Sequence, residues 1–191
     1  MLLKANALVA LRAVLALLFP FFFRLNDAPA LWWSLGLLAV MGLTDVFDGR
    51  VARKTGTTSR VGELLDSMAD GLARLTALIV FVANDLLPLW MVLVLVWRDL
   101  ISWSLRFMDL GMGQDEVHKR LSGKVNGAAQ SLLVGGVVVI LLAAALSRTW
   151  PLMNLIWWLG LAASGTALWS TVDLLRTHWL TIQRFLGLAK A

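Results

Sequence analysis

Hydrophobic residues form long runs along almost the whole chain, and short polar breaks separate these runs. Each run has roughly 20 residues or slightly more, which as a helix spans about 30 Å of hydrocarbon. Lipid cannot satisfy the edges of an open sheet, so helices are expected. The pattern therefore predicts a single all-α integral membrane domain over 1–191, with six transmembrane helices at 5–23, 31–53, 62–84, 87–109, 122–146 and 151–175.

The breaks carry residues that end helices. They lie at Asn26 to Pro29, Lys54 to Gly56, Asn84 to Pro88, Gly111 to Gly113 and Ser147 to Pro151. The last stretch, 176–191, is more amphipathic than the six runs, and we expect it to lie along the membrane surface.

Composition supports a membrane protein. Hydrophobic residues make up 59% of the 191 residues and charged residues only 15%, whereas soluble domains have about 45–50% and about 25%. The chain has no cysteine, which excludes disulfides and thiolate catalysis. The net charge of +5 is interpreted as a signal of topology and of anionic lipid headgroups, with no nucleic-acid partner expected.

Lysine and arginine are concentrated on one side of the predicted membrane. The second-to-third and fourth-to-fifth connections hold seven of the 17: Arg50, Arg53, Lys54, Arg60, Lys119, Arg120 and Lys124. The opposite connections hold only Arg24 and Arg148. The positive-inside rule then places both termini and the second-to-third connection in the cytoplasm of a bacterial-type inner membrane.

Four aspartates flank the second-to-third connection. Asp45 and Asp48 are i,i+3 neighbours on one predicted helix, and Asp66 and Asp70 are i,i+4 neighbours on the next. Carboxylates near a bilayer are rarely retained without a function. Ligands that are all oxygen suit Mg²⁺ or Mn²⁺, and two ions about 3.5–4 Å apart suit displacement at a phosphoryl group. Asp70, the deepest of the four, is also the candidate general base.

The residues around these carboxylates favour a phosphate-bearing ligand. Gly49, Ala52 and Gly62 leave room for a ligand to approach the backbone, and Arg53 and Ser59 can donate to phosphate oxygens. Simpler interpretations stay open. The aspartates can cap helices or stay solvated, Arg53 can serve topology alone, and Ser59 can be a cap or loop residue.

The segment from Asp45 to Asp70 reads D-x2-D-G-x2-A-R-x8-G-x3-D-x3-D. This pattern resembles the signature of the CDP-alcohol phosphotransferase (CDP-alcohol phosphatidyltransferase) family. The resemblance implies a six-helix, metal-dependent membrane enzyme, usually a homodimer, that displaces CMP from a CDP-linked donor with an alcohol. Position by position it implies metal binding by the four aspartates, with Asp70 doubling as base. It implies a CDP site at Asp45, Gly49, Ala52, Arg53, Ser59, Gly62 and Asp66.

Features further along the chain bear on the acceptor alcohol. Arg98-Asp99, Arg106 and Lys124 to Gln130 are similar to features of phosphatidylglycerophosphate synthases, which implies CDP-diacylglycerol as donor and glycerol 3-phosphate as acceptor. Two positions depart from that subfamily: Asn126 replaces a lysine, and Ser67 replaces a proline. Ser67 is more similar to phosphatidylserine or inositol-lipid synthases. Inositol phosphate, inositol and serine therefore remain alternative acceptors.

Several cations interrupt the predicted helices and need a partner or a polar cavity. Arg98 and Arg106 are about two turns apart and, with Lys124, can face one cavity that binds an acceptor phosphate. Arg176 is a weaker addition to this set. The alternatives are ion pairing, as expected between Asp99 and an arginine, and snorkelling to the interface. An ion or proton transporter is the rival function, although transporters usually place such residues near the midplane. A catalytically silent relative is a second rival.

Overall fold

A computed structural model describes residues 2–55, 60–111, 121–147 and 153–185, with side chains described from residue 11 onward except at 45–55, 60–61, 63, 147, 153, 180 and 184–185. All regular elements in these ranges are α-helices, which confirms the all-α prediction there. The helices are α1 Leu2–Phe22, α2 Ala28–Thr55, α3 Arg60–Ala83, α4 Leu89–Gly111, α5 Leu121–Ser147, α6 Met153–Thr177 and α7 Trp179–Phe185. The first six match the predicted ranges to within a few residues.

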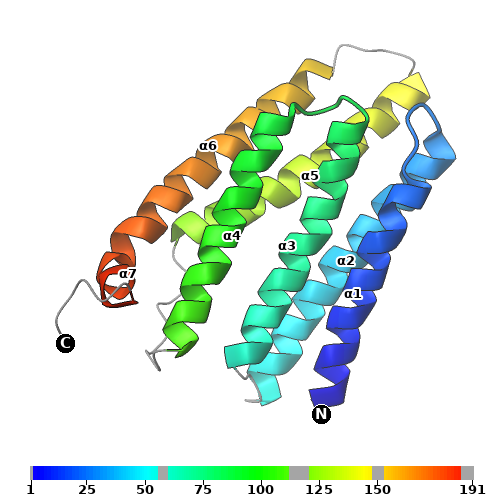
Figure 1. The fold of residues 1–191 in the computed structure, drawn as a ribbon. Coiled ribbons are helices and arrows are strands. Elements are labelled where there is room, and N and C mark those ends of the chain that lie inside the picture. The colour runs from blue at the N-terminus through cyan, green and yellow to red at the C-terminus, as the bar shows by residue number, and fades with distance from the viewer. Residues whose placement is uncertain (1, 56–59, 112–120, 148–152, 186–191) are drawn as a thin grey trace.

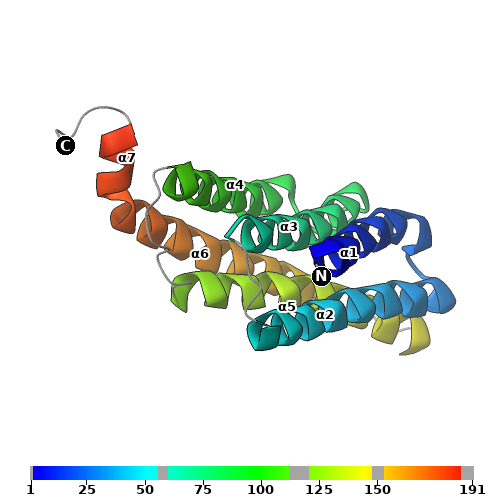
Figure 2. The same cartoon turned by 90° about the horizontal axis from the view of Figure 1, so that it is seen from below.

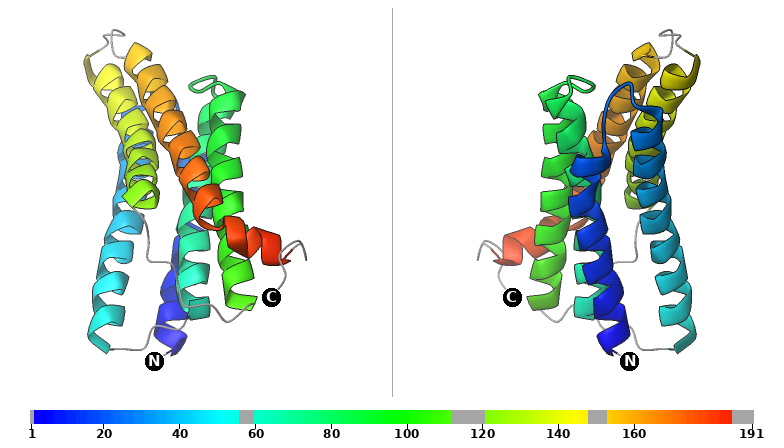
Figure 3. Two further views of the ribbon diagram at one scale, coloured as in Figure 1. Left: turned by 90° about the vertical axis from the view of Figure 1, so that its left-hand side faces the viewer. Right: turned by 90° about the vertical axis from the view of Figure 1, so that its right-hand side faces the viewer.

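The six long helices form two layers of three (Figures 1 and 2). One layer contains α1, α3 and α4, and the other contains α2, α5 and α6. Neighbours pack within each layer, and α1 contacts α2, α3 contacts α5, and α4 contacts α6 across the layers. The short α7 turns away from the end of α6 and contacts α4 and α6 (Figure 3).

Two tight turns connect helices at the end of the bundle opposite the N-terminus. Asp85 follows α3 with φ of 57°, and the next backbone N–H, of Leu86, donates to the carbonyl of Phe81 at 2.9 Å. This is a Schellman cap, with aspartate where glycine is usual. Asn26 has φ of 60°, and the carboxylate of Asp27 accepts from the backbone N–H three residues on, at 3.2 Å. That contact caps the start of α2.

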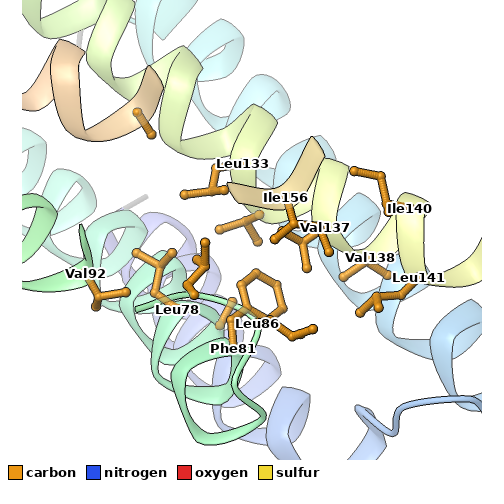
Figure 4. Packing of buried hydrophobic residues seen from close by; sticks show 14 of the residues in the cluster. Leu78, Phe81, Leu86, Val92, Leu133, Val137, Val138, Ile140, Leu141 and Ile156 are labelled. Carbon is orange, nitrogen blue, oxygen red and sulfur yellow. The ribbon is translucent and has the colours of Figure 1, made fainter. Parts of the chain in front are cut away.

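The hydrophobic core lies in the half of the bundle near these two turns (Figure 4). Leu78 and Phe81 from α3 pack with Leu133 and Val137 from α5 and Ile156 from α6, and all five are at most 2% exposed. Because apolar packing fixes this end of α3 and α5, the polar residues earlier on the same two helices are held on rigid supports.

The outer surface is apolar where a soluble protein would be polar. Five exposed tryptophans lie near the starts of α2, α4 and α6, at the end of the bundle with the two tight turns: Trp32, Trp33, Trp90, Trp157 and Trp158. Trp97, Trp169 and Trp179 are exposed further along α4, α6 and α7. Such aromatic rings are typical of the interface between a bilayer and water.

Two of the described helices are long and apolar enough to cross a membrane, over Leu121–Leu146 in α5 and Asn154–Thr177 in α6. Shorter apolar stretches cover Leu11–Phe22 and Ala28–Thr44. The first half of α3 and the second half of α4 carry charged residues, which lowers their hydropathy. The helices and their apolar surface fit a membrane protein, and the number of spans stays a prediction.

Candidate active site

A polar cavity of about 320 Å³ lies among α3, α4 and α5, in the half of the bundle away from the hydrophobic core. Its volume is within the usual range for small-molecule sites. Its lining residues are Ser67, Asp70, Arg74, Arg98, Asp99, Ser102, Trp103, Arg106, Gly123, Lys124, Gly127, Ala128 and Ser131. Four of these are cationic and two are acidic, so the cavity carries an excess of positive charge.

The cavity brings together three of the four residues predicted to bind the acceptor. Arg98 comes from the middle of α4 and Arg106 from its second half, and Lys124 comes from the first turn of α5. Arg176 is exposed in the last turn of α6 and is not a lining residue. Asp70, the candidate base, reaches the same cavity from α3.

Two of the predicted metal ligands converge on one cation. The guanidinium of Arg12, from α1, has its Nη1 atom 2.9 Å from Oδ1 of Asp66, and the same nitrogen also contacts Oδ1 of Asp70. Arg12 is only 1% exposed. Because Asp66 and Asp70 are one turn apart on α3, their carboxylates point to the same side of the helix. The site thus has two oxygen atoms aimed at one positively charged point.

This arrangement fits the chemistry of a hard divalent cation, because carboxylate oxygens from one helix face can converge on it. Asp45 and Asp48 lie on α2, but their side chains are outside the described residues, as are those of Ala52 and Arg53. Gly49 lies on the same part of α2, and Ser59 lies outside the described residues altogether. Among the described side chains, no group of three or more acidic or histidine residues has metal-binding geometry. Gly62 is described, and it is exposed near the start of α3.

A hydrogen-bond network supports the cationic wall of the cavity. Arg98 donates from Nη1 to Oδ1 of Asp99 at 2.8 Å, which confirms the expected pairing of Asp99 with an arginine. Arg98 also donates from Nε and Nη2 to Oγ of Ser170, at 3.2 and 3.0 Å. Arg74 donates from Nε to Oε1 of Gln130 at 2.9 Å. Arg98 therefore has both of the roles considered from sequence, ion pairing and lining a cavity.

Trp103 forms part of the cavity wall and lies against the backbone of α3 at Gly71, next to Asp70. A Cβ atom at Gly71 would overlap the indole ring of Trp103. We therefore expect Gly71→Ala to displace the indole and to destabilise the protein by about 1–3 kcal/mol, as overpacking usually does. Thermal unfolding in detergent measures this effect. Gly42→Ala is the matched control, because a Cβ there has no neighbour within 4 Å among the described residues. An unchanged melting temperature for Gly71→Ala would contradict the close packing.

Sequence reasoning did not assign a site role to Arg12 or Arg74, although both meet the site. Arg74 is one turn beyond Asp70 on α3, so its i,i+4 spacing from Asp70 was a usable signal. Arg12 comes from a different helix 54 residues before Asp66. The contact between α1 and α3 places it beside these aspartates.

Comparison with known proteins identifies the family. The model for CDP-alcohol phosphatidyltransferases matches residues 2–173, and the chain belongs to this family.

Its relatives include two enzymes named CDP-diacylglycerol–glycerol-3-phosphate 3-phosphatidyltransferase. The Bacillus subtilis enzyme is 35% identical over 54% of this chain and 53% of its own length, and the Haemophilus influenzae enzyme is 26% identical over 79% of this chain and 91% of its own. The cardiolipin synthase (CMP-forming) of Streptomyces coelicolor is 42% identical over 35% of this chain and 31% of its own length. The chain thus spans about half of the Bacillus relative and less of the Streptomyces one.

Proposed function

We propose that this protein transfers the phosphatidyl group of CDP-diacylglycerol to glycerol 3-phosphate and releases CMP. The observation that carries the proposal is the cationic cavity with Asp70 in its wall. Family membership supports the donor half of the reaction, and the names of the Bacillus and Haemophilus relatives support the acceptor.

The charges of the cavity favour an acceptor that bears a phosphate. Arg74, Arg98, Arg106 and Lys124 outnumber the two acidic residues in the wall. Arginine binds phosphate through paired N–H donors, and a guanidinium in a partly enclosed site attracts a dianion more strongly than one in bulk water does. Serine and inositol carry no phosphate, so they offer these cations fewer anionic oxygen atoms.

Asp70 would act on the acceptor hydroxyl as the general base. The proposed step moves the hydroxyl proton to the Asp70 carboxylate while the hydroxyl oxygen forms a bond to the phosphorus attached to diacylglycerol. The bond from that phosphorus to the bridging oxygen breaks, and CMP leaves with the electron pair. Arg74 lies one turn from Asp70 on α3, so an acceptor phosphate near Arg74 would place its alcohol near the carboxylate.

We propose that Asp45, Asp48, Asp66 and Asp70 hold two Mg²⁺ or Mn²⁺ ions. When bound, the ions would neutralise the diphosphate of the donor. Gly49, Ala52, Arg53, Ser59 and Gly62 would line the CDP moiety beside Asp45 and Asp66. These assignments rest on the spacing of the sequence pattern and on the convergence of Asp66 and Asp70.

The proposed setting is a multi-pass bacterial-type inner membrane with six spans, with the protein acting as a homodimer. Five of the exposed tryptophans, those near the starts of α2, α4 and α6, lie at one end of the bundle, and the cationic cavity lies toward the other. Together with the positive-inside rule, this supports a cytoplasmic active site and cytoplasmic termini. The acyl chains of the donor would then stay in the bilayer while its headgroup enters from the cytoplasmic side.

The relatives named cardiolipin synthase favour a second acceptor. Cardiolipin has two phosphatidyl groups on one glycerol, so its formation with release of CMP requires phosphatidylglycerol as the alcohol. Phosphatidylglycerol carries one phosphodiester charge, whereas glycerol 3-phosphate carries about two charges near neutral pH. The excess of cations in the cavity favours the latter.

The experiment is CMP release from CDP-diacylglycerol by the purified protein in detergent. Separate reactions contain glycerol 3-phosphate, phosphatidylglycerol, inositol 1-phosphate, inositol or serine, each with Mg²⁺, Mn²⁺ or excess EDTA. We expect release with glycerol 3-phosphate, and loss of release with EDTA. Release only with another acceptor would overturn the acceptor assignment and keep the family chemistry. Undiminished release in EDTA would overturn the metal assignment.

A further inference from the structure

Gln130 and Asp99 connect three helices at the cationic wall of the cavity. Gln130 on α5 accepts from Nε of Arg74 at 2.9 Å, and its Nε2 donates to Oδ1 of Asp99 at 3.5 Å. The same Oδ1 accepts from Arg98 at 2.8 Å. Gln130 is 1% exposed and Asp99 is 8% exposed. We propose that Gln130 and Asp99 are positioning residues that hold Arg74 and Arg98 as a preformed phosphate site, an inference that rests on the proposed function.

The position between Arg74 and Asp99 requires an amide side chain. It accepts a hydrogen bond from the guanidinium of Arg74 through its oxygen and donates one to the carboxylate of Asp99 through its nitrogen. Glutamate at position 130 would bring a second negative charge against Asp99. An aliphatic residue would remove both contacts and leave buried polar groups that are costly to desolvate.

The guanidinium of Arg98 is oriented from two helices. Asp99 contacts its Nη1, and Ser170 on α6 contacts its Nε and Nη2. On the α5 side, a Cβ atom at Gly123 would lie 3.4 Å from Nη2, so the guanidinium lies close to the backbone of that helix. A long side chain that is already ordered loses little conformational entropy when it binds a ligand.

Positioning and simple electrostatics predict opposite results at Asp99. Removing its charge makes the cavity more positive, so electrostatics alone predicts tighter binding of a phosphate. If Asp99 instead orients Arg98, removing the charge loosens the guanidinium and weakens binding. The direction of the change in acceptor affinity therefore separates the two roles.

The test compares Asp99→Asn and Gln130→Met with the wild-type protein. The rate of CMP release gives kcat and KM for glycerol 3-phosphate and for CDP-diacylglycerol, and calorimetry gives Kd for inorganic phosphate. We expect KM for glycerol 3-phosphate and Kd for phosphate to rise about 10-fold, as loss of a hydrogen bond to a charged group implies. KM for CDP-diacylglycerol should change less than about twofold. Asp109→Asn is the control, because Asp109 lies on α4 as Asp99 does, contacts His178 between α6 and α7, and does not line the cavity.

An unchanged or lower phosphate Kd in either folded variant overturns the positioning role. If Asp99→Asn does not fold, Gln130→Met and Ser170→Ala carry the test. Thr171→Val is the control for Ser170→Ala, since its hydroxyl donates only to the carbonyl of Ala167 in its own helix among the described contacts. If the wild-type protein binds phosphate but does not use glycerol 3-phosphate, the proposed acceptor is wrong. The phosphate Kd of the variants then still decides the positioning role. Wild-type protein that binds no phosphate overturns the inference itself.

Discussion

Asp70→Asn is expected to lower kcat for CMP release by about 10²- to 10⁴-fold, the range that a general base usually contributes. Asparagine has nearly the same shape as aspartate, but it cannot take a proton from the acceptor hydroxyl. Asp70 lines the cavity that also contains Arg74 and Arg98, so a proton acceptor there is next to the proposed phosphate site. Steady-state rates with saturating glycerol 3-phosphate and CDP-diacylglycerol measure the effect.

Asp85→Asn is the matched control for this change. Asp85 is exposed in the turn between α3 and α4, and asparagine also tolerates its positive φ. The control should keep the wild-type rate. Asp70→Asn also removes a charge that contacts Arg12, so the melting temperature of each variant must be recorded. A folded Asp70→Asn protein with near-normal kcat would show that Asp70 is not the base.

The fold was largely predictable from sequence because hydrophobic runs and turn residues carry strong local signals. The breaks at Asn26 to Pro29 and at Asn84 to Pro88 coincide with the two tight turns, where Asn26 and Asp85 adopt positive φ. Asparagine and aspartate tolerate this conformation better than most residues. The pairing of layers was not predictable, since it depends on which helix faces match in three dimensions.

The site was predictable in part, for a similar reason. Asp66 and Asp70 share a helix face, and Arg98 and Arg106 are two turns apart, so local spacing alone brings each pair together. Arg12, Gln130 and Ser170 meet those residues only through contacts between helices distant in sequence. No local pattern specifies such contacts. Arg176 was grouped with the acceptor residues from its charge, and it is exposed at the end of α6 away from the cavity lining.

Arg12→Gln is expected to lower kcat by about 10- to 100-fold and to lower the melting temperature. Arg12 is 1% exposed and is the cation that contacts both Asp66 and Asp70. Without its charge, two carboxylates at i,i+4 spacing repel each other, and both can turn away from the cavity. The measurements are the rate of CMP release and thermal unfolding of the purified protein in detergent, across a series of Mg²⁺ or Mn²⁺ concentrations.

Arg12→Lys and Arg24→Gln are the comparison variants for Arg12→Gln. Lysine restores the charge but lacks the planar donors of arginine, so Arg12→Lys should recover only part of the rate. Arg24 is exposed just after α1, and its replacement should leave the rate unchanged. If Arg12 orients the carboxylates, Arg12→Gln needs more divalent metal for half-maximal rate. If Arg12 instead competes with the metal for the carboxylates, the variant needs less. The direction of that shift therefore decides whether Arg12 prepares the carboxylates for the ion or takes its place.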